Sequence, residues 1–200
     1  MENRNLFETI REFAVKNSEL DDIHGFPHVD RVYNLCLKLT KDLNVNIKVL
    51  KIAALLHDIG RNKKDITKEK KNHAEVSSEL ADKYLSSQNF NISEEELKNV
   101  IHCIRSHSYS NDLPPRTLEA KILSDADKLD AIGAIGLYRT IGYTVKNEGT
   151  IINVIEHLED KIMKLKDKLF LGISKKIAEK REKIIFEFYK EIKNESIIRG

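Results

Sequence analysis

The sequence predicts an all-α protein, and three observations support this fold class. Apolar residues recur at spacings of three and four along most of the chain, whereas no stretch alternates with the period of two that marks a half-buried strand. Charged residues make up 33% of the sequence, with only three prolines and eight glycines, a composition typical of helices with solvated faces. The 200 residues suffice for one well-packed domain, and no linker or repeat divides them. We therefore expect a single domain over residues 1–200, in which helices from about residue 151 onward pack back on the core.

Each expected helix carries its own apolar stripe. Two of them begin with an N-cap residue that is followed by a glutamate three positions later, at Asn72 and at Ser93. Residues 61–71 form a polar, lysine-rich loop, and residues 142–149 are expected to form a mobile loop. The expected helices cover residues 5–16, 28–43, 46–60, a segment after 72, 93–107, 118–129, 151–168 and 174–193.

Charge and composition exclude several classes of function. Lys and Arg number 34 against 32 Asp and Glu, and the net charge of +2 provides no field that would attract nucleic acid or a membrane surface. The start of the chain is polar and no run of eighteen apolar residues occurs, so we expect a cytoplasmic protein. Cys36 and Cys103 stand singly in expected helices and are predicted to be buried, reduced thiols. Monomer and homodimer both remain open.

The stretch from Leu55 to Gly60 contains a histidine and an aspartate at the inner end of an apolar helix. His57 lies four positions after Ala53, which continues the buried face of that helix. A buried, unpaired carboxylate is very costly, and a metal ion would satisfy both His57 and Asp58. The alternative is that His57 is a hydrogen-bonded core histidine and Asp58 a charge at a helix end.

Three helices bring suitable metal ligands near an apolar face. Two imidazoles and two carboxylates leave positions open on a six-coordinate divalent ion, for water or a phosphate oxygen, and open positions indicate catalysis. The expected metal ligands are His28, His57, Asp58 and Asp127.

The choice of Asp127 rests on its neighbours. Asp125 and Asp130 lie in the same segment and compete for the role. Asp127 is preferred because its helical neighbours Leu123 and Ala131 are apolar, whereas the other two carboxylates would also suit solvated helix caps.

The order of these residues resembles the H…HD…D signature of the HD-domain metal-dependent phosphohydrolases. Six segments match the motifs of that superfamily in the same order: 24–32, 53–60, 73–81, 104–108, 125–136 and 157–166. The resemblance implies an all-helical HD fold with a metal site between core helices, a bound divalent ion and hydrolysis of a phosphoester or phosphoanhydride. The most similar branch is the compact bacterial and archaeal one associated with nucleotide pyrophosphohydrolysis.

The resemblance therefore implies a small nucleotide as substrate. The expected reaction cleaves a nucleoside or deoxynucleoside triphosphate to monophosphate and pyrophosphate with metal-activated water. Mn, Ni, Co, Fe, Zn and Mg all remain candidates for the ion, with one site expected and a second left open. The near-zero net charge adds that a long polyanion such as nucleic acid has no basic track to follow. A 5'-nucleotidase or phosphomonoesterase and an HD-fold diiron oxygenase are the alternatives.

Two further histidines, His73 and His107, join Asp58 as candidate catalytic residues. His73 falls in the first turn of its helix, where the positive dipole end favours the neutral imidazole. By resemblance to six-ligand relatives, both would complete a dinuclear site; alternatively they flank one metal and handle protons and phosphate oxygens. A third interpretation makes them ordinary surface histidines.

Phosphate recognition also needs cations beside the metal. A lysine in so lysine-rich a chain more often belongs to a solvated face than to a site. Lys128, Arg139 and Lys161 rank highest because they lie in the part of the chain that the resemblance covers, and Arg61 lies three positions after Asp58.

Overall fold

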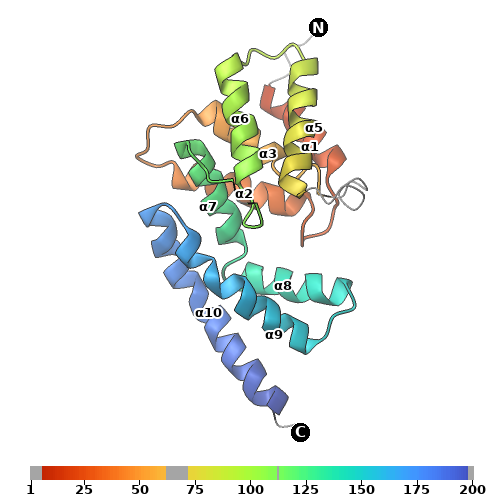
Figure 1. The fold of residues 1–200 in the computed structure, drawn as a ribbon, viewed down its shortest axis with the longest axis vertical. Coiled ribbons are helices and arrows are strands. Elements are labelled where there is room, and N and C mark those ends of the chain that lie inside the picture. The colour runs from red at the N-terminus through yellow and green to blue at the C-terminus, as the bar shows by residue number, and fades with distance from the viewer. Residues whose placement is uncertain (1–5, 62–71, 112, 198–200) are drawn as a thin grey trace. The chain divides into compact units, whose positions relative to one another are not determined.

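The computed structural model describes residues 6–61, 72–111 and 113–197, and the regular structure in these ranges is helical throughout (Figure 1). The prediction of an all-α fold is confirmed. By its internal contacts the chain divides into two compact units, Met1–Asp127 and Lys128–Gly200. A single functional domain therefore stays a prediction. Within the described residues, no helix is both long enough and apolar enough to cross a membrane.

The first unit is built around one nearly all-apolar helix, α3, which contacts α1, α2, α5 and α6. Val49, Leu50 and the five residues from Ile52 to Leu56 are all buried, as expected for a helix that is hydrophobic on every side. Among the described residues, the helices of this unit are α1 (Leu6–Asn17), α2 (Phe26–Leu39), α3 (Ile47–Leu56), α5 (His73–Ser87), α6 (Glu94–Ser106) and the larger part of α7 (Leu118–Asp130). The predicted buried thiols are confirmed, since Cys36 in α2 and Cys103 in α6 are buried and free.

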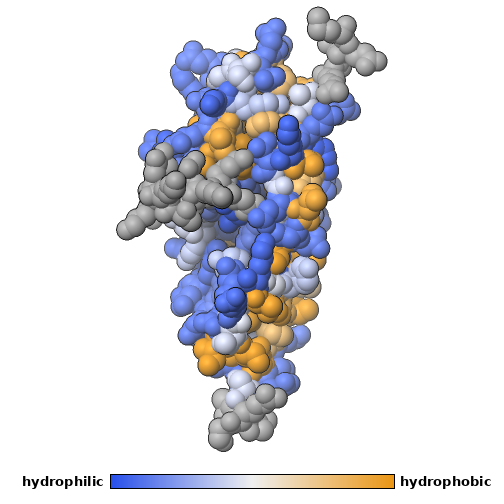
Figure 2. Space-filling model, turned by 90° about the vertical axis from the view of Figure 1, so that its right-hand side faces the viewer, coloured by the Kyte–Doolittle hydropathy of each residue, from blue (hydrophilic) through white to orange (hydrophobic). Residues whose placement is uncertain are grey.

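The second unit consists of α8 (Ala134–Lys146), α9 (Ile151–Asp160), two 3-10 turns (Ile162–Lys164 and Lys166–Lys168) and α10 (Gly172–Ile197). Helix α10 contacts both α8 and α9. Figure 2 shows apolar side chains in patches among hydrophilic ones on both the upper and the lower part of the surface drawn there. Large exposed apolar residues of this unit include Ile135, Tyr138, Val145, Ile151 and Ile152.

Both helix starts that the sequence marked are confirmed. The Asn72 side chain accepts a hydrogen bond from the Ala74 N–H at the start of α5. At the start of α6, Ser93 Oγ accepts from the Glu96 N–H and the Glu96 carboxylate accepts from the Ser93 N–H, which completes a capping box. Two otherwise unpaired N–H groups are thereby satisfied.

The Ser93→Ala variant should lose about 1 kcal/mol of unfolding free energy, because the first turn of α6 loses its side-chain acceptor. Urea unfolding followed by circular dichroism measures the change. Ser86→Ala, on an exposed part of α5, is the matched control and should change stability by less than about 0.5 kcal/mol. Equal losses in both variants would contradict the importance of the capping box.

Two predicted boundaries in the second unit are wrong. Residues 142–149 do not form a loop, since α8 continues to Lys146 and only the next four residues turn the chain. The Thr144 hydroxyl donates to the Thr140 carbonyl, so the helical pattern continues past Gly142. The helix predicted for residues 151–168 ends at Asp160, because the buried Ile162 and Leu165 are spaced by three, which suits 3-10 turns.

Candidate metal centre

The His–Asp pair follows directly on the last residue of α3. His57 is the C-cap of that helix, and its Nδ1–H donates to the Ala54 carbonyl at 2.8 Å. A carbonyl can only accept, so the proton lies on Nδ1 and the Nε2 lone pair points away from the helix. The bond also satisfies one of the carbonyls that every helix end leaves without a partner.

His107 has the same arrangement at the end of α6. It is the C-cap of that helix, and its Nδ1–H donates to the Ile104 carbonyl at 2.6 Å. Its Nε2 is fully buried and has no hydrogen-bond partner among the described residues. Because a buried polar atom without a partner is costly, this lone pair fits a ligand position.

Asp58 lies at the centre of four histidines. Its Oδ2 atom is 3.6 Å from His28 Nε2 and 3.8 Å from His57 Nε2. Its Oδ1 atom is 3.6 Å from His73 Nε2 and 3.6 Å from His107 Nε2. The two oxygens of one buried carboxylate thus divide the four imidazoles into two pairs.

Two groups of donors result, and both include Asp58. His28, His57 and Asp58 form the first group, and Asp58, His73 and His107 form the second, with donor atoms in each group within 4.8 Å of one another. The Asp127 Oδ1 atom lies 3.3 Å from His28 Nε2, next to the first group. We call these residues the histidine–aspartate cluster. Imidazole nitrogen and carboxylate oxygen together suit a divalent ion such as Mn, Fe, Co, Ni or Zn.

Arg61 lies against the same carboxylate. Its Nε–H donates to Asp58 Oδ2 at 2.7 Å, and its Nη2 group donates to Asp58 Oδ1 at 3.2 Å. The same Nη2 group is 3.1 Å from His73 Nε2. Arginine has no acceptor atom, so His73 Nε2 accepts this bond and its proton is on Nδ1. The residue predicted to bind phosphate therefore contacts the cluster through Asp58 and His73.

Residues 25–132, more than half of the chain, match the family model described as HD domain. The chain belongs to the HD-domain family. The matched segment includes every member of the histidine–aspartate cluster: His28, His57, Asp58, His73, His107 and Asp127.

Two curated proteins are similar to this HD domain in sequence. The uncharacterized protein YpgQ of Bacillus subtilis is 26% identical over 180 residues, which are 86% of this chain and 84% of YpgQ. Ribonuclease Y of Treponema denticola is 31% identical over 104 residues, but these are 52% of this chain and only 18% of that enzyme. The similarity to ribonuclease Y is therefore partial, whereas that to YpgQ extends over most of both chains.

Solved structures have the same HD fold. A crystal structure from Lactobacillus plantarum has a TM-score of 0.81 at 26% identity, with 99% of this chain and 100% of that chain covered. An HD-superfamily hydrolase from Bacillus thuringiensis has a TM-score of 0.69 at 26% identity, with 94% and 95% covered. YpgQ in complex with ADP has a TM-score of 0.76 at 23% identity, with 94% and 97% covered. The similarity to the HD-superfamily hydrolase from Bacillus thuringiensis supports hydrolase activity for this HD domain, whereas the YpgQ complex shows the fold alone.

Burial favours the neutral form of two histidines in the cluster, His57 and His73. Burial lowers the pKa of His57 to about 4, although the Asp58 carboxylate opposes the shift. Burial likewise lowers the pKa of His73 to about 3, again against the effect of Asp58 and with a further contribution from Arg61. Burial alone would raise the pKa of Asp58, but the Arg61 guanidinium and the surrounding histidines hold it well below its usual value. Neutral imidazoles beside an ionised carboxylate are the forms that bind a metal ion.

Sequence reasoning missed the contact that holds α5 against the turn of residues 57–61, which we call the HD turn. The Gly60 N–H donates to Ser77 Oγ at 3.0 Å, and a Cβ atom at Gly60 would lie 2.5 Å from the Ser77 backbone nitrogen. Only glycine lets the two backbones approach this closely. The available signal was the spacing of four between His73 and Ser77, which places both side chains on the same face of α5.

The Gly60→Ala variant should lose about 1–3 kcal/mol of unfolding free energy and also bind metal more weakly, because the HD turn, which carries His57 and Asp58, must shift away from α5. Urea unfolding and metal titration measure the two effects. Gly172→Ala is the matched control, since a Cβ atom there meets nothing within 4 Å. If Gly60→Ala were as stable as Gly172→Ala, this contact would not matter.

The other predicted cations belong to the second unit. The Arg139 Nη1 group donates to Asp130 Oδ2 at 2.7 Å, and both side chains are buried. The ammonium group of the buried Lys128 lies 5.8 Å from the centre of the Phe170 ring. Lys161 is the C-cap residue of α9. Substrate binding by Lys128, Arg139 and Lys161 stays a prediction. Asp130, which the sequence left as an alternative to Asp127 for the metal-ligand position, pairs with Arg139.

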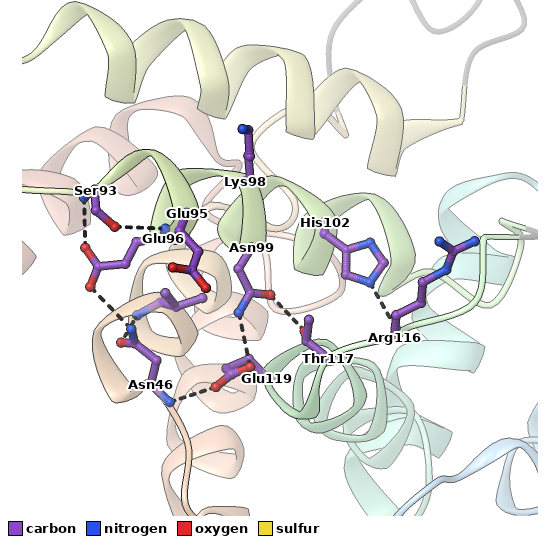
Figure 3. Close-up of a pocket in the computed structure, with 11 residues that line it drawn as sticks. Asn46, Ser93, Glu95, Glu96, Lys98, Asn99, His102, Arg116, Thr117 and Glu119 are labelled. Atoms are coloured by element: carbon purple, nitrogen blue, oxygen red, sulfur yellow. Dashed lines mark hydrogen bonds between the residues drawn. The ribbon is translucent and has the colours of Figure 1, made fainter.

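A groove of about 750 Å³ lies elsewhere on the first unit, and none of its lining residues belongs to the cluster (Figure 3). His102 lines this groove, where its Nε2 accepts from the Arg116 N–H at 2.9 Å. The buried Glu119 carboxylate accepts from the Asn46 N–H and from the Asn99 side chain. These polar groups pair with one another, so they connect α3, α6 and α7 as part of the framework of the first unit.

Proposed function

We propose that this HD domain is a divalent-metal-dependent phosphohydrolase acting on small nucleotides, which cleaves nucleoside triphosphates to monophosphate and pyrophosphate. The observation that carries the proposal is the position of Asp58, whose two oxygens face four histidine Nε2 atoms. Two of these rings, His57 and His107, are oriented by carbonyls of their own helices. Such preset donors are typical of metal sites.

His28, His57, Asp58 and Asp127 would hold the ion, because together they offer two nitrogen and two carboxylate ligands on one side of the cluster. A bound divalent ion lowers the pKa of water toward neutrality and neutralises charge on phosphoryl oxygens. His107 directs its unpaired Nε2 to the other side of Asp58, where it can accept a proton from water or a hydrogen bond from substrate. The low pKa of His73 keeps that ring neutral at physiological pH.

Two observations support a small nucleotide as the substrate. YpgQ, which is similar to this chain over most of its length, forms a complex with ADP. The net charge of +2 also leaves no excess of positive charge for a long polyanion. The partial similarity to ribonuclease Y makes RNA phosphodiester hydrolysis the second candidate function. A nucleotidase and a diiron oxygenase are the remaining alternatives.

The test uses chelator-treated protein reloaded separately with Mn, Ni, Co, Fe, Zn or Mg. Each form is assayed on nucleoside mono-, di- and triphosphates and on a short single-stranded RNA, in water enriched in oxygen-18. We expect pyrophosphate and a nucleoside monophosphate in equal amounts, with the label in the monophosphate if water attacks the α-phosphorus. Orthophosphate from monophosphates would favour a nucleotidase, shortened RNA a nuclease, and oxygen uptake with iron an oxygenase.

A further inference from the structure

Arg61 contacts the second donor group in a way that its predicted role as a phosphate ligand does not explain. The group consists of Asp58, His73 and His107. The Arg61 Nη2 group donates to Asp58 Oδ1 at 3.2 Å and to His73 Nε2 at 3.1 Å. Two of the three donor atoms that a second cation would need are therefore already bonded to a cation of the chain itself.

The bond to His73 is the decisive one. A carboxylate oxygen has two lone pairs, so each oxygen of Asp58 can bind Arg61 and a further partner at once. A neutral imidazole has only one acceptor nitrogen, and in His73 that nitrogen accepts from Arg61. His73 cannot bind a metal ion unless this hydrogen bond breaks.

The charges of the cluster also disfavour a second divalent ion. The first group contains the carboxylate of Asp58, and Asp127 lies beside it. The two negative charges of these carboxylates match one divalent ion. The second group shares Asp58 and adds only imidazoles, whereas Arg61 adds a positive charge that persists at every physiological pH. A second divalent ion would therefore enter a region that the first ion and Arg61 have already made positive.

We propose that Arg61 takes the place of a second metal ion and limits the centre to one divalent ion, held by His28, His57, Asp58 and Asp127. The inference rests on the proposed function, since it assumes the first ion. In this arrangement Arg61 fixes the orientation of Asp58 and keeps the His73 ring in a single tautomer. His107 keeps its buried lone pair available for a proton or for substrate.

Metal counting in Arg61→Met tests the proposal without an activity measurement. Methionine has a similar length but neither the charge nor the donors of arginine. After chelation, reloading with Mn(II) and removal of free ions, we expect about one ion per chain in the unmodified protein and about two in Arg61→Met. Electron paramagnetic resonance should then show coupled Mn(II) ions in the variant alone. Arg105→Met, which removes an exposed arginine of α6, is the matched control and should keep about one ion.

Further variants test the role of Arg61 and His73 without relying on Arg61→Met alone. Arg61→Gln should also raise the count, and it serves if the methionine variant fails to fold. His73→Ala alone should keep about one ion, whereas His73→Ala added to Arg61→Met should return the count from about two to about one. Loss of the ion in His73→Ala would overturn the proposal, because it would make His73 a ligand of the first ion.

The outcomes separate this inference from the proposed function. Two ions in the unmodified protein, or one ion in folded Arg61→Met and Arg61→Gln, would overturn the role of Arg61 and leave the phosphohydrolase proposal standing. No bound ion in the unmodified protein would contradict the proposed function and this inference with it.

Discussion

The Asp58→Asn variant should lose metal-dependent hydrolysis by about a thousand-fold or more, equivalent to ~4 kcal/mol of transition-state stabilisation. Asparagine keeps the shape of the side chain but removes the negative charge that both donor groups share. Phosphate release from the preferred substrate, with bound metal measured in parallel, gives the two numbers to compare. We expect both to fall together, because without this carboxylate the four histidines lose their common anionic partner.

Asp30→Asn is the control for this experiment. Asp30 lies on α2 with His28, but its carboxylate is partly exposed and pairs with Arg11 at 2.7 Å. An exposed pair contributes little to stability, so the variant should retain activity and metal. Circular dichroism should show the same helix content in both variants, since the buried residues of α3 are untouched. Full turnover in Asp58→Asn would refute the assignment of the metal centre.

The metal-free protein should become less stable as the pH falls from 6.5 to about 4. Burial lowers the pKa of His57 from 6.5 to about 4 in the folded chain, so in this interval the unfolded chain binds a proton that the folded chain does not. Stability is therefore present above pH 6.5 and is lost on acidification. His57 alone should cost about 3 kcal/mol across the interval, and His73 adds to the loss because its pKa is also lowered.

Urea unfolding of chelator-treated protein at several pH values measures this loss. The His57→Gln variant should show a shallower dependence on pH, because glutamine does not titrate. Asp58 contributes little in this interval, because its stabilising effect is lost only as the pH falls below about 3.8, the ordinary pKa at which this carboxyl takes up a proton in the unfolded chain. A flat stability profile between pH 6.5 and 4 would contradict the buried, neutral state of His57.

The sequence predicted those parts of the fold that depend on local signals. The capping residues Asn72 and Ser93 start helices as expected, because an N-cap acts on N–H groups only a few residues away. The His–Asp pair ends an apolar helix for the same reason, since its helical spacing from Ala53 is local. The end of α9 was missed because the choice between a continued helix and 3-10 turns depends on which residues the rest of the unit buries.

The candidate site was predictable in its residues and not in its contacts. The order of histidines and aspartates in the chain marked the candidate ligands, and the structure gathers His28, His57, His73 and His107 around Asp58. No local pattern shows that Arg61 bonds to a histidine twelve positions later. The spacing of four between His73 and Ser77 marks the face of α5 but not its distance from Gly60, because that close approach arises from the packing of α5 on the turn after α3.

The C-cap positions of His57 and His107 bear on how readily the centre accepts its ion. Each ring is already held in one rotamer by its bond to a carbonyl three residues earlier. Ordering a free side chain at a binding site costs about 0.5–1.5 kcal/mol, and for these two rings that loss of freedom has occurred when the helices form. Affinity for the ion is thus linked to the end of α3, so a change that frays its last turn should weaken metal binding without touching any ligand. Fraying of α6 should instead disturb the His107 ring that faces water or substrate.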